Sequence, residues 1–177
     1  YQPYEMGCLL VRNHKWLSGT FTEKPEYLKD VEGNSSEINF YDHGIQLTRR
    51  FRALKFYMSI KTFGLKAFRE AVQYNIELAE KVESNLRTSA LWEIVSPATL
   101  AVINFRYNPI SRNLPENELD ELNRKISQQV VESREAMLVT TYLNGMVVLR
   151  MCLINPRTTL QDVQDTLDLC EKIGETL

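Results

Sequence analysis

The dipeptide Asn144-Gly145 constrains the fold of this chain more than any other feature, because it separates two strongly apolar runs. Asparagine and glycine adopt the positive φ angles of a two-residue β-turn, so the pair is a strong hairpin signal. The flanking runs, at 137–143 and 146–154, have the length and composition of strands. We therefore predict an antiparallel sheet in the second half of the chain.

Two further strands and a helix are predicted before this hairpin. The strands are expected at 91–95 and 99–105, on either side of Ser96-Pro97. The helix begins at Pro115-Glu116. Its apolar residues recur at helical spacing: Leu119, Leu122, Ile126 and Val130.

A final helix follows the hairpin. Thr159 and Asp162 resemble a capping box at its start, and Gly174 is expected to end it. Its apolar stripe consists of Leu160, Val163, Leu167 and Cys170. Residues from about 90 onward are therefore predicted to form a small α+β unit, in which two helices cover an antiparallel sheet.

The first half of the chain has a different pattern. An apolar run at 6–11 has the length of a buried strand. Residues 22–39 are polar and lack a sustained apolar period, which is typical of a lid or binding loop. A helix from Arg49 to Gly64 is apolar on nearly all sides, which predicts deep burial. The helix after it is half exposed, and its apolar face consists of Leu65, Phe68, Val72, Ile76, Ala79 and Val82.

Charge and composition exclude several classes of protein. Lys plus Arg number 21 and Asp plus Glu number 23, and this formal net charge of −2 argues against a nucleic-acid-binding protein. No apolar run approaches the ~20 residues of a membrane span. The three cysteines are scattered and lack metal-ligand spacing to the two histidines, so neither a disulfide framework nor a metal site is predicted. A reduced, cytoplasmic setting is expected.

Arg150 is the first candidate functional residue, because it is the only charged side chain in the predicted strand 146–154. A buried charge without a partner is very costly. Arg150 is therefore expected to contact a carboxylate or phosphate of a ligand, or else to occupy a structural ion pair or a strand-edge position with its head in water.

A basic cluster and a loop tyrosine are the other candidates. Arg49, Arg50, Arg52 and Lys55 lie where a helix begins, and the helix dipole disfavours cations there. They either pair with acids of a neighbouring segment or subunit, or contact an anion or substrate. Tyr27, in the long polar loop, either packs against the protein or delivers a proton as a lid residue.

Five stretches of the chain form a recognisable set. They are Tyr1-Gln-Pro-Tyr-Glu-Met-Gly-Cys-Leu-Leu-Val-Arg12, Pro25-Glu-Tyr-Leu28, Leu47-Thr-Arg-Arg-Phe-Arg-Ala-Leu-Lys55, Phe63-Gly64 and Val148-Leu-Arg150. In order and spacing they resemble the pyridoxal-phosphate-dependent group II amino-acid decarboxylases. The resemblance implies an α/β and α+β fold. Residues 1–87 would be the end of the large domain of a type I, aspartate aminotransferase-like transferase, with a mobile catalytic loop at about 22–39, and 88–177 would be the small C-terminal α+β domain.

The resemblance also implies roles for individual residues. Tyr27 matches the family's loop tyrosine, which returns a proton to the carbon that loses carbon dioxide and which acts on the partner subunit's site in a homodimer. Thr48 matches a substrate-pocket position that is glycine in enzymes for large aromatic substrates and a hydroxyl residue in some others, so threonine argues slightly against a catechol-sized substrate. Arg150 matches an arginine near the substrate carboxylate. Arg49 and Arg50 match a basic pair that we expect to be mainly structural.

The cofactor implied by the resemblance is pyridoxal 5′-phosphate. The family's cofactor lysine lies in a His-Lys-Trp motif, which is expected just upstream of Tyr1, so we expect this chain to be a C-terminal portion that holds none of the cofactor contacts itself. The motif His14-Lys15-Trp16 follows the apolar run at 6–11 instead of preceding it. Lys15 is therefore expected to be a coincidental match.

The leading hypothesis is a carboxy-lyase that acts on an amino acid and is incomplete without its N-terminal part. One alternative is an aldehyde-forming, oxidative enzyme of the same fold. In those relatives the loop tyrosine is typically phenylalanine, so Tyr27 favours decarboxylation. The other alternative is a non-catalytic interaction fragment, whose apolar residues at 51–60 would associate with a partner.

Overall fold

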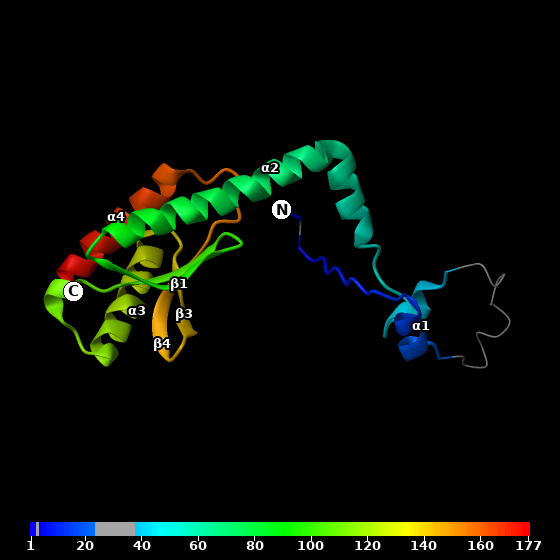
Figure 1. Ribbon diagram of the computed structural model, residues 1–177, viewed down its shortest axis with the longest axis horizontal. Coiled ribbons are helices and arrows are strands. Elements are labelled where there is room, and N and C mark those ends of the chain that lie inside the picture. The colour runs from blue at the N-terminus through cyan, green and yellow to red at the C-terminus, as the bar shows by residue number, and fades with distance from the viewer. Residues whose placement is uncertain (3, 24–37) are drawn as a thin grey trace. The chain divides into compact units, whose positions relative to one another are not determined.

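The computed structural model describes residues 1–2, 4–23 and 38–177 (Figure 1). The chain divides into an amino-terminal unit, Gln2–Thr62, and a carboxyl-terminal unit, which consists of Tyr1 and Phe63–Leu177. The domain boundary that the sequence predicts at 87/88 concerns the complete enzyme and stays a prediction.

A four-stranded antiparallel sheet forms the centre of the carboxyl-terminal unit. Its strand order is β1-β2-β4-β3. The strands are β1 (Trp92–Thr99), β2 (Val102–Tyr107), β3 (Val139–Leu143) and β4 (Met146–Cys152). Asn144 and Gly145 join β3 to β4 with φ angles of 53° and 81°. The hairpin predicted from this dipeptide is therefore confirmed, with the turn conformation that these two residues favour.

The turn between the first two strands lies later than the sequence predicts. Ser96-Pro97 was expected to separate the strands, but both residues belong to β1, and the chain reverses after Thr99 instead. The β1–β2 register shifts on both sides of Ser96. Because β1 is an edge strand, this irregular pairing accommodates a proline that has no N–H to donate.

Three helices complete the core of this unit. They are α3 (Glu116–Ser133), α4 (Leu160–Thr176) and the carboxyl-terminal part of α2 (Ala53–Thr88). A short 3-10 helix, η3 (Ile110–Arg112), follows β2. Two covering helices were predicted, and α2 contributes a third set of buried side chains: Leu78, Ala79, Val82 and Leu86.

Polar side chains fix these helices to the sheet. Glu83 of α2 accepts a hydrogen bond from the backbone N–H of Ala98 at 2.6 Å, and this bond lowers the pKa of Glu83. Asn123 of α3 is fully buried. Its amide oxygen accepts from the N–H of Tyr107 at 2.8 Å, and its amide nitrogen donates to the Tyr107 carbonyl at 3.0 Å. The amide of Asn123 thus provides hydrogen-bond partners for both the backbone N–H and the carbonyl of Tyr107.

The start of α4 agrees with the sequence, but its end does not. Asp162 N–H donates to Thr159 Oγ1 at 3.2 Å, and Thr159 N–H donates to Asp162 Oδ2 at 2.8 Å, so the capping box is confirmed. Gly174 was expected to end the helix, yet α4 continues to Thr176. Gly174 is buried against the Tyr107 ring, so close packing explains the glycine.

The amino-terminal unit corrects two predictions about burial. It contains α1 (Lys15–Phe21), the 3-10 helix η2 (Phe40–His43) and the beginning of α2. The run 6–11 is not a strand, and Leu10 is 90% exposed. The helix expected to be deeply buried is also exposed, with Phe51 73% accessible. A strand needs a neighbouring strand and an apolar helix needs a covering surface, and the described residues of this unit supply neither.

Gly64 interrupts α2 at the position where the sequence predicts a helix end. Its φ and ψ angles are 79° and 154°, which are not helical. A residue with a side chain would be strained at this positive φ, so the break depends on glycine. Within the described ranges, no helix has the length and apolar character needed to cross a membrane.

Candidate functional site

The predicted catalytic residue, Tyr27, lies outside the described residues. Its assignment as the proton donor therefore stays a prediction.

Thr48 lies in the amino-terminal unit, between η2 and α2, where it is exposed and lines a pocket of about 690 Å³. The segment 46–53 forms most of the wall, and Gly7 and Phe40 complete it. A residue of this wall limits the size of any ligand in the pocket. The predicted role of Thr48 in substrate binding is compatible with this position.

Three arginines line the same pocket. Arg52 donates from Nε and Nη2 to Glu5 Oε1, at 2.9 and 2.6 Å, and is thereby paired. The Arg49 guanidinium carbon lies 5.9 Å from the centroid of the Phe40 ring, a cation–π geometry. The Arg50 side chain makes no hydrogen bond or ion pair with the rest of the described chain. The pocket is therefore positively charged.

Arg150 lies on β4 of the carboxyl-terminal unit, opposite Asn104 of β2 and Val139 of β3. Its side chain is exposed and pairs with no carboxylate among the residues that the structure describes. The exposed head agrees with one alternative posed by the sequence, but β4 lies between β2 and β3, so the strand-edge position in that alternative is wrong. A contact with substrate stays a prediction.

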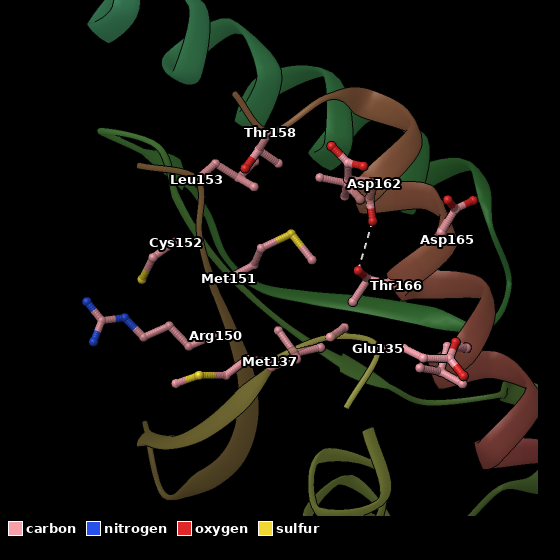
Figure 2. Close-up of a pocket in the computed structure, with 14 residues that line it drawn as sticks. Glu135, Met137, Arg150, Met151, Cys152, Leu153, Thr158, Asp162, Asp165 and Thr166 are labelled. Carbon is pink, nitrogen blue, oxygen red and sulfur yellow. Dashed lines mark hydrogen bonds between the residues drawn. The ribbon is translucent and has the colours of Figure 1, made fainter. Parts of the chain in front are cut away.

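A pocket of about 460 Å³ extends from Arg150 toward α4 (Figure 2). Figure 2 shows Met151 pointing toward α4, whereas Arg150 and Cys152 point away from it. This arrangement follows from the alternation of side chains along a strand. The far wall carries the carboxylates of Asp162 and Asp165. Arg150 thus lies at the edge of a mixed-charge pocket and not at its centre.

Arg106 is a buried arginine that the sequence reasoning missed. Its side chain is 4% exposed, donates to Glu93 Oε2 at 2.7 Å, and forms two hydrogen bonds to Glu116 at 2.7 and 3.1 Å. The bond to Glu116 contributes most to raising the pKa of Arg106. The alternation of apolar and polar residues in 102–107 was the available signal. Because Arg106 is fully paired, its role is structural.

The described residues do not form a pyridoxal-phosphate site by themselves. A lysine that forms a Schiff base is held in an enclosed site that keeps its amine reactive. Lys15 is instead exposed at the first position of α1. No cluster of metal-ligating side chains occurs in the described ranges either. The cofactor lysine upstream of Tyr1 stays a prediction.

Comparison with known proteins places the chain in a family. The profile described as "Pyridoxal-dependent decarboxylase conserved domain" matches residues 2–108. The aromatic-L-amino-acid decarboxylase of Bacillus atrophaeus is 48% identical over 176 residues, which cover 99% of this chain and 36% of that protein. A phenylacetaldehyde synthase of a Rosa hybrid cultivar is 29% identical, over 81% of this chain and 29% of that protein.

Solved structures agree with this match. The crystal structure of Oryza sativa TDC with PLP and tryptamine is similar with a TM-score of 0.80 and 25% identity, over 94% of this chain and 34% of that one. The chain thus spans about a third of the length of the relatives it matches. It shares their fold and their sequence profile. The chain therefore belongs to the pyridoxal-dependent decarboxylase family.

Proposed function

We propose that this chain is the C-terminal part of a pyridoxal-phosphate-dependent L-amino-acid decarboxylase. The observation that carries the proposal is the 48% identity to an aromatic-L-amino-acid decarboxylase along 99% of the chain. The reaction takes up one proton and converts the amino acid to carbon dioxide and the corresponding amine. The cofactor, held by the rest of the enzyme, supplies an electron sink at the carbon that loses the carboxylate.

The residues of this chain would bind the substrate and return the proton. Thr48 would limit the space for the substrate side chain, as its place in the pocket wall supports. Arg150 would lie near the carboxylate. Tyr27 would donate its phenolic proton to the α-carbon after carbon dioxide leaves, once its loop excludes water. Because this loop acts on the partner subunit's site in the family, a homodimer is part of the proposal, as is a cytoplasmic location.

An aromatic amino acid is the substrate class that the relatives support. The Bacillus atrophaeus protein is named for aromatic L-amino acids, and the rice structure contains tryptamine. Thr48 alone favoured a smaller substrate. A single ring that carries at most one hydroxyl group, as in phenylalanine or tyrosine, satisfies both arguments.

Aldehyde formation is a second candidate function, because a phenylacetaldehyde synthase is among the relatives. That reaction would consume dioxygen and water and release an aldehyde, carbon dioxide, ammonia and hydrogen peroxide. The tyrosine at position 27 argues against it, since the resemblance associates phenylalanine there with aldehyde formation.

Product analysis of the complete enzyme tests both candidates. Cofactor binding is first checked by absorbance at ~420 nm, and the enzyme is then supplied with phenylalanine, tyrosine or tryptophan. We expect equal amounts of amine and carbon dioxide. The Tyr27→Phe variant should form less amine and should release aldehyde and peroxide, whereas Tyr142→Phe, on the exposed edge strand β3, should behave as the wild type. Aldehyde from the wild type, or an unchanged Tyr27→Phe, would contradict the proposal.

A further inference from the structure

Arg50 is a cation without a local explanation. It lies two residues after Thr48 and lines the same pocket. The neighbouring arginines have partners, since Arg52 is paired with Glu5 and Arg49 lies over Phe40. The Arg50 side chain has no hydrogen-bond or ion-pair partner in the described part of the chain. The structural role expected for it from the sequence is therefore not visible in its contacts.

Helix stability does not account for Arg50 either. It precedes α2 by three residues, and the first turn of α2 contains no acidic side chain. A cation near the amino end of a helix is unfavourable, because the helix dipole is positive there. An anionic ligand in the pocket would remove this cost.

The rest of the pocket wall suits a ligand with an apolar body. Phe40, Leu47 and Phe51 line it, and their side chains are 67%, 55% and 73% exposed. With a volume of about 690 Å³, the pocket has room for a molecule of amino-acid size. Its chemistry therefore combines apolar surface with the guanidinium of Arg50, which contacts no partner in the described part of the chain.

We propose that Arg50 binds the carboxylate of the substrate, an apolar or aromatic amino acid whose side chain lies against the apolar wall beside Thr48. The planar guanidinium matches a carboxylate in a bidentate pair. The proposal rests on the proposed function, because it takes the ligand to be the amino-acid substrate. It makes Arg50 a substrate-binding residue of the amino-terminal unit, in addition to the predicted Arg150.

Calorimetric titration of the complete enzyme with two probes that cannot be decarboxylated by it tests this. The first, 3-phenylpropionate, keeps the carboxylate and the ring but lacks the amine, and the second, phenylethylamine, lacks the carboxylate. Arg50→Gln should weaken binding of 3-phenylpropionate roughly 10- to 100-fold, as expected for the loss of a charged hydrogen-bonded pair. It should leave the dissociation constant of phenylethylamine unchanged. Arg50→Lys should retain part of the affinity for 3-phenylpropionate, since lysine keeps the positive charge but cannot form the bidentate pair.

Arg157→Gln is the matched control, because Arg157 is exposed and its side chain is likewise without a partner in the described residues. It should bind both probes as the wild type does. Equal affinities of Arg50→Gln and Arg157→Gln for 3-phenylpropionate would overturn the proposal. Inorganic phosphate is titrated as a third probe. If Arg50→Gln lost affinity for phosphate alone, this result would also overturn the proposal.

Failure of this proposal is distinguishable from failure of the proposed function. Probe affinities are measured without turnover, so they report on the pocket even if no amine is formed. Conversely, an enzyme that forms amine but whose probe affinities ignore Arg50 would refute only the carboxylate assignment. Should Arg50→Gln not fold, Arg50→Lys decides the same question through the same two dissociation constants.

Discussion

Gly174 of α4 packs directly against the ring of Tyr107 in β2. A Cβ atom at position 174 would lie 2.5 Å from Tyr107 Cε1, closer than two carbon atoms approach without a shift. Both residues are buried in the core. The contact therefore sets how closely α4 approaches the sheet.

Gly174→Ala should consequently destabilise the protein, although alanine is the better helix former. Overpacking of a core typically costs about 1–3 kcal/mol, which exceeds the gain of about 1 kcal/mol in helix propensity. The free energy of unfolding in urea measures the result. Lys172→Ala, on the exposed side of α4, is the control and should change stability little. A Gly174→Ala variant as stable as the wild type would show that the ring moves aside freely.

Gly145→Ala should also destabilise the protein, for a different reason. No atom lies within 4 Å of a Cβ at this position, so space is not limiting. The φ angle of 81° is strained for a residue with a side chain, and about 1 kcal/mol is expected. Gly145→Asn should cost less, because asparagine tolerates this conformation better. Equal losses for the two variants, measured by urea unfolding, would contradict this explanation.

The Arg106–Glu116 pair should make stability depend on pH in the acid range. Arg106 lowers the pKa of Glu116 through the hydrogen bonds it donates. A carboxyl group whose pKa is lower in the folded state stabilises the protein above its ordinary pKa, and this contribution is lost as the pH falls through the lowered value. Wild type should therefore exceed Glu116→Gln in stability at pH 7, and the difference should shrink as the pH falls below about 4.5.

Glu118→Gln provides the control for this measurement, because Glu118 is exposed in the same first turn of α3 but is not bonded to Arg106. Its effect on the free energy of unfolding should be smaller at pH 7. A difference between wild type and Glu116→Gln that stays constant from pH 7 to pH 3 would refute the titration of Glu116 as its cause.

Cys170 should resist thiol reagents in the folded enzyme. Burial raises its pKa to about 12, so almost no thiolate is present at pH 8, and the thiolate is the reactive form. After iodoacetamide treatment, peptide mapping by mass spectrometry should find position 170 unmodified until denaturant is added. Rapid labelling of Cys170 in native buffer would show that α4 opens locally.

Local signals in the sequence predicted the carboxyl-terminal unit well. The Asn144-Gly145 turn and the Thr159–Asp162 capping box each depend on residues within three positions of one another, so their geometry is encoded locally. The prediction that Gly174 ends the helix was wrong because its contact, Tyr107, is distant in sequence, and only the packed structure shows the close approach.

Burial and ion pairing were harder to predict. The run 6–11 and the helix containing Phe51 have apolar sequences, yet their exposure depends on which surfaces lie beside them. Arg106 was overlooked because its partners, Glu93 and Glu116, come from a neighbouring strand and a following helix. The site role of Thr48 came from the family resemblance alone, whereas Arg150 was also a candidate as the only charged residue in its predicted strand.

The two-sided bond between Asn123 and Tyr107 fixes the position of α3 along the strand it contacts. Sliding the helix by one turn, about 5.4 Å, would remove the side-chain amide from both backbone groups and leave all of them unpaired in an apolar interior. Apolar side chains in the same layer could be exchanged for others of similar volume without such a penalty. The amide of Asn123 therefore allows only one position of α3 along its axis, whereas apolar contacts alone would tolerate several.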